Sequence, residues 1–318
     1  MLIQSTYSTK FPVNNGHLET IIPYFLRQVP KVPFGRERIN TKDGDFLDLD
    51  WHRANNSKLV VLSHGLEGCS ESNYIMGLTR HLSSFGYDVL AWNNRGCSGE
   101  TNNLLKMYHS GASYDLREVL NHVFHNTNYQ EINLVGFSMG GNITLKYLGE
   151  EANNLNSRIK KAVAVSVPIS LADCAEALSK GFSKVYARTF IRRIIKKLHI
   201  KTERFPDYDP DFKTLNKIWD FEEFDDRITA PINGFENAQD YWDQSSSMHY
   251  LKDIQLKTLI VNALNDPFLK KRCYPFEELK NHAYIDFETP LRGGHVGFVQ
   301  TGLNDVWIDK RITEYLAN

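Results

Sequence analysis

A serine set between two glycines, in residues 136–140 (GFSMG), is the strongest chemical signal in the sequence. It fits the pattern G-x-S-x-G, in which a serine nucleophile stands on a sharp turn between a strand and a helix. The glycines leave room for that turn, and the first amides of the helix favour developing negative charge. The pattern therefore favours nucleophilic catalysis by Ser138 over the alternative, a chance match in a strand–turn–helix unit.

Two later residues can complete a relay with this serine, whose hydroxyl is a poor nucleophile without a neighbouring base. Asp266 follows the apolar run 257–263, and His295 lies among glycines after the expected strand 283–287. Serine, acid and histidine in this order are expected after a G-x-S-x-G turn. Asp before Pro is also common in turns, and His among glycines can be an ordinary loop residue. All three in order, each after a strand, favour a charge relay of Ser138, His295 and Asp266.

A tetrahedral oxyanion needs hydrogen-bond donors, and two backbone amides are placed to supply them. One is the amide of Met139, next to the serine. The other is the amide of Leu66 in residues 64–68 (HGLEG), where we expect Gly65 to permit the unusual backbone geometry. We expect His64 to hold this loop by hydrogen bonds rather than to shuttle protons. Glu67 would oppose an oxyanion, so we expect its side chain to point away.

The elements that must position these groups alternate between strand and helix patterns. Such alternation predicts an α/β fold with a mostly parallel sheet and helices on both faces. The expected strands are 46–52, 58–63, 87–92, 132–137, 161–167, 257–263 and 283–287, and the expected helices are 73–85, 113–124, 138–148 and 299–316.

One interval, 168–248, shows no convincing strand and contains helical patterns at 171–181 and 184–199. It is too long for a loop, so we expect a mainly helical cap inserted in a core of residues 1–167 and 249–318. Because the preceding strand ends on the side of the serine turn, the cap should lie over Ser138. We expect it to set acyl-chain preference without supplying catalytic groups, with Ile194 and Ile195 among its pocket-facing residues.

The cap holds a marked charge asymmetry. Nine Lys or Arg residues stand between Lys180 and Arg204, where Glu203 is the only acid. A basic amphipathic helix can lie on an anionic membrane. We favour the alternative, a lid helix whose apolar face covers the pocket and whose bases meet the acidic run at 220–226, but peripheral membrane contact stays open.

Composition excludes several other classes of protein. The chain has 318 residues, 42% of them hydrophobic and 24% charged, which indicates a globular enzyme. Its 37 basic and 38 acidic residues give a net charge of -1, which argues against nucleic acid as a partner. The four cysteines show no C-x-x-C spacing, so we expect neither a zinc site nor a disulfide framework, and no cofactor. Neither a signal peptide nor a run of about 18 apolar residues is apparent, so a cytoplasmic location is expected.

Beyond these motifs, the chain resembles the α/β-hydrolase superfamily and, more closely, the YheT-like (EMB8-like) family of esterases. Residues 15–23 are similar to the family's N-x-H-L-Q-T-I-x-P, with Glu19 where Gln is usual. Residues 64–74 (HGLEGCSESNY) resemble its H-G-L-E-G-S-x-x-S-x-Y, with Cys69 for Ser. Residues 94–100 and 108–111 are similar to its R-G-C-S-G and Y-H-S-G blocks.

The resemblance implies an α/β-hydrolase fold, Ser138, Asp266 and His295 as charge-relay residues, and hydrolysis of carboxylic esters without naming one substrate. Esters with short to medium acyl chains and lipid-like esters are the expected substrates. Two alternatives stay open: acyl transfer to an alcohol at the same site, and a non-catalytic binding protein of the same fold.

Overall fold

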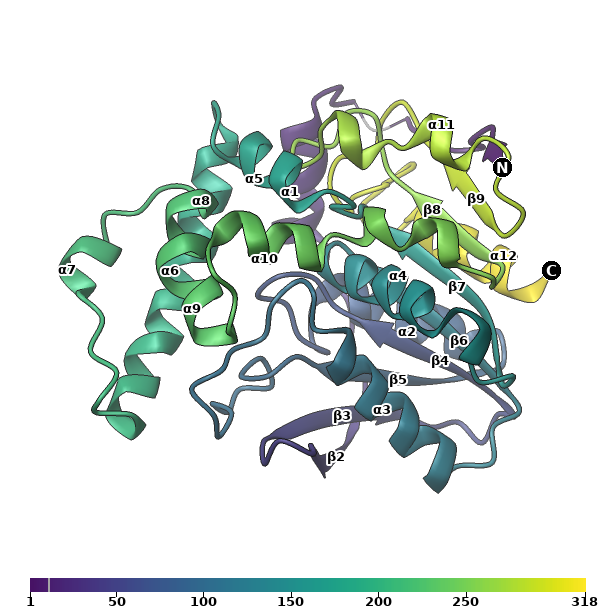
Figure 1. Ribbon diagram of the computed structural model, residues 1–318. Helices are drawn as coiled ribbons and strands as arrows, with labels where there is room; N and C mark the ends of the chain where they lie inside the picture. The colour runs from purple at the N-terminus through teal and green to yellow at the C-terminus, as the bar shows by residue number, and fades with distance from the viewer. Residues whose placement is uncertain (11) are drawn as a thin grey trace.

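Nine strands form one sheet in the computed structural model, which describes residues 1–10 and 12–318 (Figure 1). Short apolar runs rich in β-branched residues form the central strands, as expected for strands buried on both faces. The strands are β1 (Leu2–Ile3), β2 (Gly35–Asn40), β3 (Phe46–His52), β4 (Lys58–Ser63), β5 (Tyr87–Asn93), β6 (Glu131–Phe137), β7 (Ile159–Val165), β8 (Thr258–Val261) and β9 (Ile285–Glu288).

The sheet is mostly parallel, as the sequence predicted. Its order is β1-β9-β8-β7-β6-β4-β5-β3-β2, and only β2 and β3 run antiparallel to their neighbours. The carboxyl ends of β4, β6, β7, β8 and β9 therefore meet at one edge of the sheet. Ligands of open parallel sheets bind at this edge.

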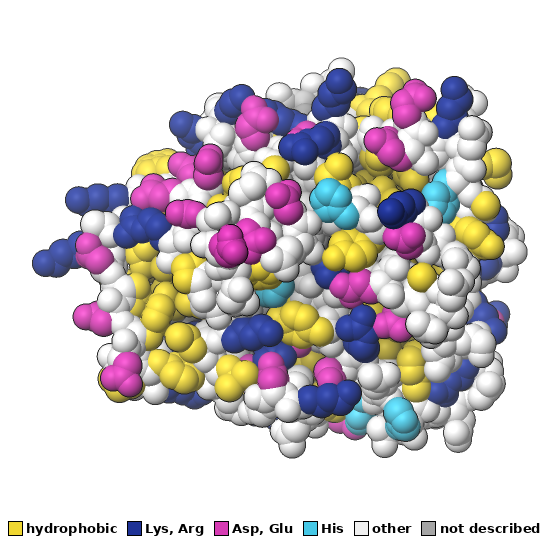
Figure 2. All heavy atoms as spheres, in the orientation of Figure 1, with side chains coloured by type: hydrophobic (Ala, Val, Ile, Leu, Met, Phe, Trp, Pro, Cys, Tyr) yellow, Lys and Arg dark blue, Asp and Glu magenta, His cyan; other side chains and the backbone are white. Residues whose placement is uncertain are grey.

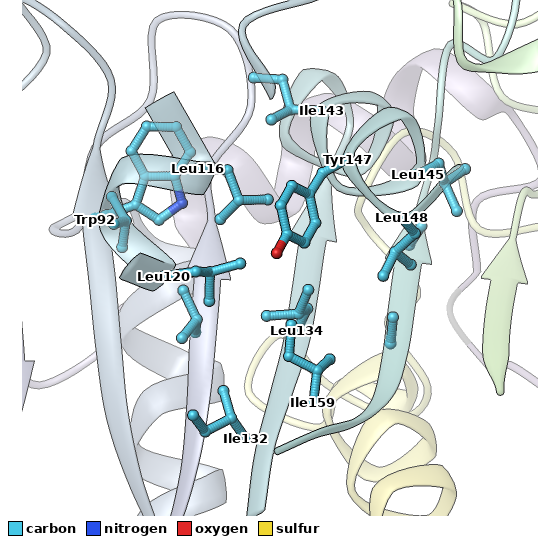
Figure 3. Close-up of a cluster of buried hydrophobic side chains, with 14 of the residues drawn as sticks. Trp92, Leu116, Leu120, Ile132, Leu134, Ile143, Leu145, Tyr147, Leu148 and Ile159 are labelled. Carbon is cyan, nitrogen blue, oxygen red and sulfur yellow. The ribbon is translucent and has the colours of Figure 1, made fainter. Parts of the chain in front are cut away.

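Helices cover both faces of the sheet. The apolar residues of α3 recur at Leu116, Val119, Leu120 and Val123, one face of a helix, and pack with α4 on one side (Figure 3). Helices α2 and α12 pack on the other side. Outside the interval 168–248 the helices are α1 (Gly16–Leu26), α2 (Asn73–Ser84), α3 (Ser113–Asn126), α4 (Met139–Glu151), α11 (Phe276–Leu279) and α12 (Trp307–Ala317).

Residues 168–248 are helical and contain no strand. Figure 1 shows their helices gathered at one side of the sheet, on the left of the view. They contribute most of an apolar cluster that includes Ile191, Ile195, Phe224 and Trp242 and that extends to Phe268 outside the interval. Their helices are α5 (Leu171–Leu178), α6 (Ser183–Arg204), α7 (Phe212–Leu215), α8 (Phe221–Phe224), α9 (Ala230–Asn233) and α10 (Ala238–Ser245), with a π-helical turn at Asp225–Thr229. The division of the chain at 168 and 248 stays a prediction.

The predicted elements differ from the structure mainly near the ends of the chain. Helix α12 begins at Trp307, not at 299, because residues 299–306 turn back on themselves through the bridge between Val299 and Val306. Gly302 accepts a hydrogen bond from the Asp305 amide in that turn, and Gly, Asn and Asp favour such turns. Strands β1 and β2 and helix α1 were not predicted.

Candidate active site

Ser138 stands on the sharp turn that its glycine neighbours predicted. Its backbone has φ 52° and ψ −120°, an unusual conformation between strand β6 and helix α4. A methyl group on Gly136 would overlap the carbonyl of Gly140, and one on Gly140 would overlap the carbonyl of Ser63. Glycine is therefore required at both positions, because strand and helix pack too closely for any side chain.

The structure brings Ser138, His295 and Asp266 together. His295 Nε2 lies 2.9 Å from Ser138 Oγ, and His295 Nδ1 lies 2.8 Å from Asp266 Oδ2. An ionised carboxylate only accepts hydrogen bonds, so Nδ1 carries the proton and Nε2 can accept from the serine hydroxyl. The Asp266 side chain is fully buried, and the Phe268 ring stacks on the imidazole at 4.1 Å. This geometry suits removal of the serine proton by a neutral histidine.

Helix α1 holds the loops that carry the acid and the histidine, a role that sequence reasoning missed. Thr20 Oγ1 accepts the His295 backbone N–H at 2.8 Å. The buried Glu19 carboxylate accepts from the Asn265 side chain at 2.6 Å and from Arg292 Nε at 2.7 Å. The segment 15–23 was notable in the sequence only for its family resemblance. That resemblance was the one signal that could have indicated the role.

The loop after β4 packs Gly65 against Ser138 and places Leu66 in the wall of the same cavity. In the described part of the chain the Leu66 N–H has no acceptor, and the Met139 N–H begins helix α4, where amides lack intrahelical acceptors. Both residues line the cavity at Ser138. The explanation given for Gly65 was wrong, since the positive φ of 54° belongs to Glu67. Gly65 is needed for space, because a Cβ there would lie 3.2 Å from Ser138 Cβ.

His64 ties this loop down, as expected. Its Nε2 accepts the Asn94 backbone N–H at 3.1 Å, so Nδ1 carries the proton and donates to the Gly65 carbonyl at 2.7 Å. Burial lowers the pKa of His64 to about 4, which keeps the ring neutral. A neutral imidazole that is hydrogen-bonded through both ring nitrogens holds the loop in place and does not shuttle protons.

The carboxylate of Glu67, which we expected to point away, is bound on two sides. It accepts the Tyr108 hydroxyl at 2.6 Å and pairs with Lys197 of helix α6 at 2.7 Å. Lys197 therefore balances the negative charge beside the Leu66 amide. The same ammonium lies 3.3 Å from the Cys97 sulfur, where burial raises the thiol pKa to about 12 and keeps it protonated.

Arg95 organises the loop after β5 through contacts with carboxylates. Its guanidinium is almost fully buried and contacts Asp115 at 2.7 Å, Asp45 at 3.0 Å and Asp43 at 2.9 Å. Bidentate carboxylate contacts of this kind fix geometry as well as charge. Carboxylates therefore surround Arg95 in this glycine-rich segment. Their negative charge would repel a phosphate group, so the segment is not a phosphate-binding loop.

A cavity of about 730 Å³ opens over Ser138 and His295. Its walls are mainly apolar, and many of them come from residues 168–248. Ile194 lines it, whereas Ile195 is buried in the apolar cluster of these helices and does not. The wall residues from this segment include Leu178, Tyr186, Phe190, Ile194, Phe224 and Ile228.

The expected pairing of the α6 bases with the acidic run 220–226 was wrong. No ion pair joins the two among residues 1–10 and 12–318. Lys197 turns to Glu67 instead, and Arg188 donates to the Asn216 carbonyl at 2.7 Å. Figure 2 shows acidic side chains gathered on the surface over the helices α8 to α10. Three other α6 bases, Arg193, Lys201 and Arg204, donate to oxygen atoms of the protein. The remaining α6 bases, Lys184, Arg192 and Lys196, are exposed and have no ion-pair partner among the described residues.

Two further properties bear on function. Within the residues that the structure describes, no three or more His, Cys, Asp or Glu side chains are grouped as metal ligands. No described helix is long and apolar enough to cross a membrane.

Comparisons with known proteins identify the family of the chain. Residues 58–300 match the family described as alpha/beta hydrolase fold. YheT of Escherichia coli (strain K12), to which an esterase function is ascribed, is 35% identical over 312 residues, covering 96% of this chain and 91% of the relative. Phospholipase ABHD3 of Mus musculus is 28% identical over 296 residues, covering 89% of this chain and 70% of the relative.

Solved structures match in fold. The Pyrococcus furiosus esterase Pf2001 superposes with a TM-score of 0.60 at 19% identity, covering 92% of this chain and 97% of the other. At this identity the likeness concerns the fold alone.

Proposed function

Because the chain belongs to the alpha/beta hydrolase family, we propose that it is a serine hydrolase that cleaves carboxylic esters. The observation that carries the proposal is the chain of hydrogen bonds from Ser138 through His295 to Asp266. The names of its relatives, among them esterase and phospholipase, agree with this class of substrate.

In the proposed mechanism His295 Nε2 takes the proton of Ser138 as Oγ attacks the ester carbonyl. The amides of Leu66 and Met139 hold the resulting oxyanion, and each such donor contributes about 3 kcal/mol to transition-state stabilisation. His295 then gives its proton to the leaving alcohol, which departs as the acyl–Ser138 ester remains. Water attacks this ester by the same route and releases the acid. Asp266 orients the imidazole and stabilises its charge throughout.

The size and lining of the cavity support the proposal that the substrates are esters with short to medium acyl chains or lipid-like esters. Its volume of about 730 Å³ accommodates a drug-sized ligand. Apolar walls gain about 0.8 kcal/mol for each buried methylene. We therefore expect a broad optimum in acyl length rather than selection of a single chain.

Labelling with a fluorophosphonate and turnover of p-nitrophenyl esters test the proposal. Wild type should be labelled at Ser138 and should hydrolyse the esters, Ser138→Ala should do neither, and the exposed Ser84→Ala should behave as wild type. Equal turnover by wild type and Ser138→Ala would favour the non-catalytic alternative. In a mixture of water and ethanol, a larger share of ethyl ester among the products than the ethanol content of the mixture would favour acyl transfer.

The mouth of the cavity suits contact with an anionic lipid surface. This mouth is lined by exposed Tyr24 and Phe25 of α1, by Phe182 just before α6 and by Val185 of α6. The two helices lie side by side, since the His17 ring is 5.1 Å from the Phe182 ring. Apolar residues at a mouth rimmed by bases match the charge of anionic lipid.

Three exposed bases of α6 carry this part of the proposal: Lys184, Arg192 and Lys196 have no ion-pair partner in the described chain. The protein should co-sediment with vesicles that contain phosphatidylglycerol and not with pure phosphatidylcholine. Arg192→Glu with Lys196→Glu should abolish binding, while the exposed Lys280→Glu at the end of α11, outside residues 168–248, should not. Equal binding to both kinds of vesicle, or self-association of the protein without vesicle binding, would contradict this part of the proposal.

A further inference from the structure

The loop that carries His295 has an unusual backbone conformation. Four of its residues have a positive φ: Gly293 (139°), Gly294 (59°), Val296 (63°) and Phe298 (47°). Glycine adopts this region readily, but for a β-branched residue such as Val296 it is a rare and strained conformation. Strain of this kind persists only where the surrounding structure fixes it, and it clusters at active sites. Contacts from outside the loop must therefore impose its shape.

Side chains from other segments supply these contacts. Four consecutive amides of the loop, those of residues 293–296, each donate to a side-chain oxygen. In chain order the acceptors are Glu19 Oε2 at 3.0 Å, Asn265 Oδ1 at 3.0 Å, Thr20 Oγ1 at 2.8 Å and Ser166 Oγ at 3.0 Å. Most backbone amides donate to backbone carbonyls, so this run of side-chain acceptors indicates a loop whose path depends on its neighbours. We call the four side chains the histidine-loop acceptors.

Ser166 is the histidine-loop acceptor that lies at the sheet. The others belong to helix α1 or to the loop of the catalytic acid, whereas Ser166 directly follows strand β7. Its own amide donates to the Val261 carbonyl of β8 at 2.8 Å. Ser166 is fully buried and does not line the cavity, so its hydroxyl acts on the loop and not on a substrate.

The end of β7 holds the backbones of both partners in the proposed proton transfer. The Val165 carbonyl accepts the Ser138 amide at 2.8 Å, and the next residue, Ser166, accepts the Val296 amide at 3.0 Å. Two adjacent residues thus connect the turn of the nucleophile with the residue after the base. The 2.9 Å contact between Ser138 Oγ and His295 Nε2 depends on the separation of these two backbones.

The backbone of Ser166 is itself strained. Its φ is 53°, in the left-handed region that glycine adopts without steric cost. Glycine would therefore suit the backbone of this position better than serine does. What serine adds is the hydroxyl group, and the bond that this group makes is the one to the Val296 amide.

We propose that Ser166 is a positioning residue for the catalytic base: its hydroxyl fixes the Val296 amide and so holds the His295 imidazole at hydrogen-bonding distance from Ser138. This inference rests on the proposed ester hydrolysis at Ser138. Without the acceptor, the strained backbone at Val296 can relax and carry the imidazole away from the serine hydroxyl. The cavity walls stay in place, so the chemical step should be impaired and substrate binding should not.

Ser166→Gly tests this role, because glycine keeps the backbone conformation and removes only the side chain. On p-nitrophenyl esters kcat should fall about 10- to 100-fold, as for a misplaced catalytic group, while KM stays within about twofold of wild type. Ser166→Ala keeps the Cβ atom and should show the same loss, so it replaces the glycine variant if that variant does not fold. The matched control is Thr41→Gly, which removes a buried acceptor of the Asp45 amide in the turn after β2 and should keep kcat.

Proton NMR of the free enzyme separates the position of His295 from turnover. The proton between His295 Nδ1 and Asp266 should give a low-field resonance in wild type and in Thr41→Gly, and this resonance should broaden or disappear in Ser166→Gly. An unchanged kcat with an intact resonance in Ser166→Gly would overturn the inference, as would an equal loss of kcat in Thr41→Gly. If wild type hydrolyses no ester while the resonance still depends on Ser166, the positioning role stands and the proposed hydrolysis is refuted.

Discussion

Glu67 and Lys197 form an ion pair of 2.7 Å that joins the loop after β4 to helix α6. The carboxylate belongs to the residue that follows Leu66, whose amide we propose as an oxyanion donor. A segment far from the nucleophile in sequence thus supplies the positive charge that this acid requires.

Removing that charge should slow catalysis. Lys197→Met leaves the Glu67 carboxylate unbalanced beside developing negative charge, so kcat should fall by about tenfold or more. Glu67→Gln combined with Lys197→Met should recover most of the loss. Lys196→Met, an exposed neighbour on the same helix, serves as control. Steady-state kinetics on a soluble ester decides, and a double variant as slow as the single one would contradict the electrostatic explanation.

Helix α1 should matter for kcat rather than for binding. Glu19→Ala removes the bonds to Asn265 and Arg292 and frees the loops of Asp266 and His295, so we expect kcat to fall about 10- to 100-fold, in line with losses from misplaced catalytic groups. Glu19→Gln keeps a bonding partner for Asn265 and should lose less. The measurement is kcat and KM together. The exposed Glu314→Ala is the control, and a change confined to KM would count against positioning.

Ile194 and Ile195 should separate acyl preference from stability. Ile194→Ala enlarges the cavity, so the optimum acyl length should shift upward or broaden while fluorophosphonate labelling persists. Ile195→Ala creates a void in the apolar cluster and should lower the free energy of unfolding by about 2–4 kcal/mol without shifting the optimum. A panel of p-nitrophenyl esters and a urea titration measure both. Identical profiles for the two variants would contradict this division.

Arg95 should be one of the most costly polar positions to change. Arg95→Leu leaves Asp45 and Asp115 buried without a cation, which should lower the free energy of unfolding by about 3–5 kcal/mol. Arg117→Leu is the matched change at a partly exposed pair with Glu151 and should cost at most about 1 kcal/mol. Urea denaturation of the two variants compares them directly. Similar losses would mean that burial does not govern the difference.

His64 should make stability depend on pH. Its pKa is about 4 when folded and about 6.5 when unfolded, so the unfolded chain binds the extra proton between these values and stability falls as pH falls. From pH 7.5 to 5 this group should account for a loss of about 2 kcal/mol. His64→Gln should show that much less pH dependence than wild type in guanidinium titrations, and the exposed His125→Gln should match wild type.

The sequence was most informative where one local pattern determined one element. An alternating pattern predicted β3 and an apolar run predicted β4, both with the bounds observed, and the glycines around Ser138 predicted its strained turn. The places of Asp266 and His295 followed from strand order, because parallel strands end at one edge. Neither depended on contacts between distant segments.

What could not be predicted depends on contacts between distant residues. Nothing local shows that Glu19 reaches Asn265, 246 positions later, or that Lys197 turns to Glu67 rather than to the acidic run. The start of α12 was misplaced because residues 299–306 close a turn around Gly302, held by the bridge between Val299 and Val306. Tertiary contacts decided all three.

The bond from His295 to Thr20 also has a temporal consequence. The two residues are 275 positions apart, so helix α1 leaves the ribosome long before the loop that it must hold. At the usual pace of synthesis that interval lasts on the order of half a minute. During the later part of this interval the nucleophile turn has already been synthesised while its base is still untranslated. We therefore expect the nascent chain to have no hydrolase activity until the loop that carries His295 has been synthesised.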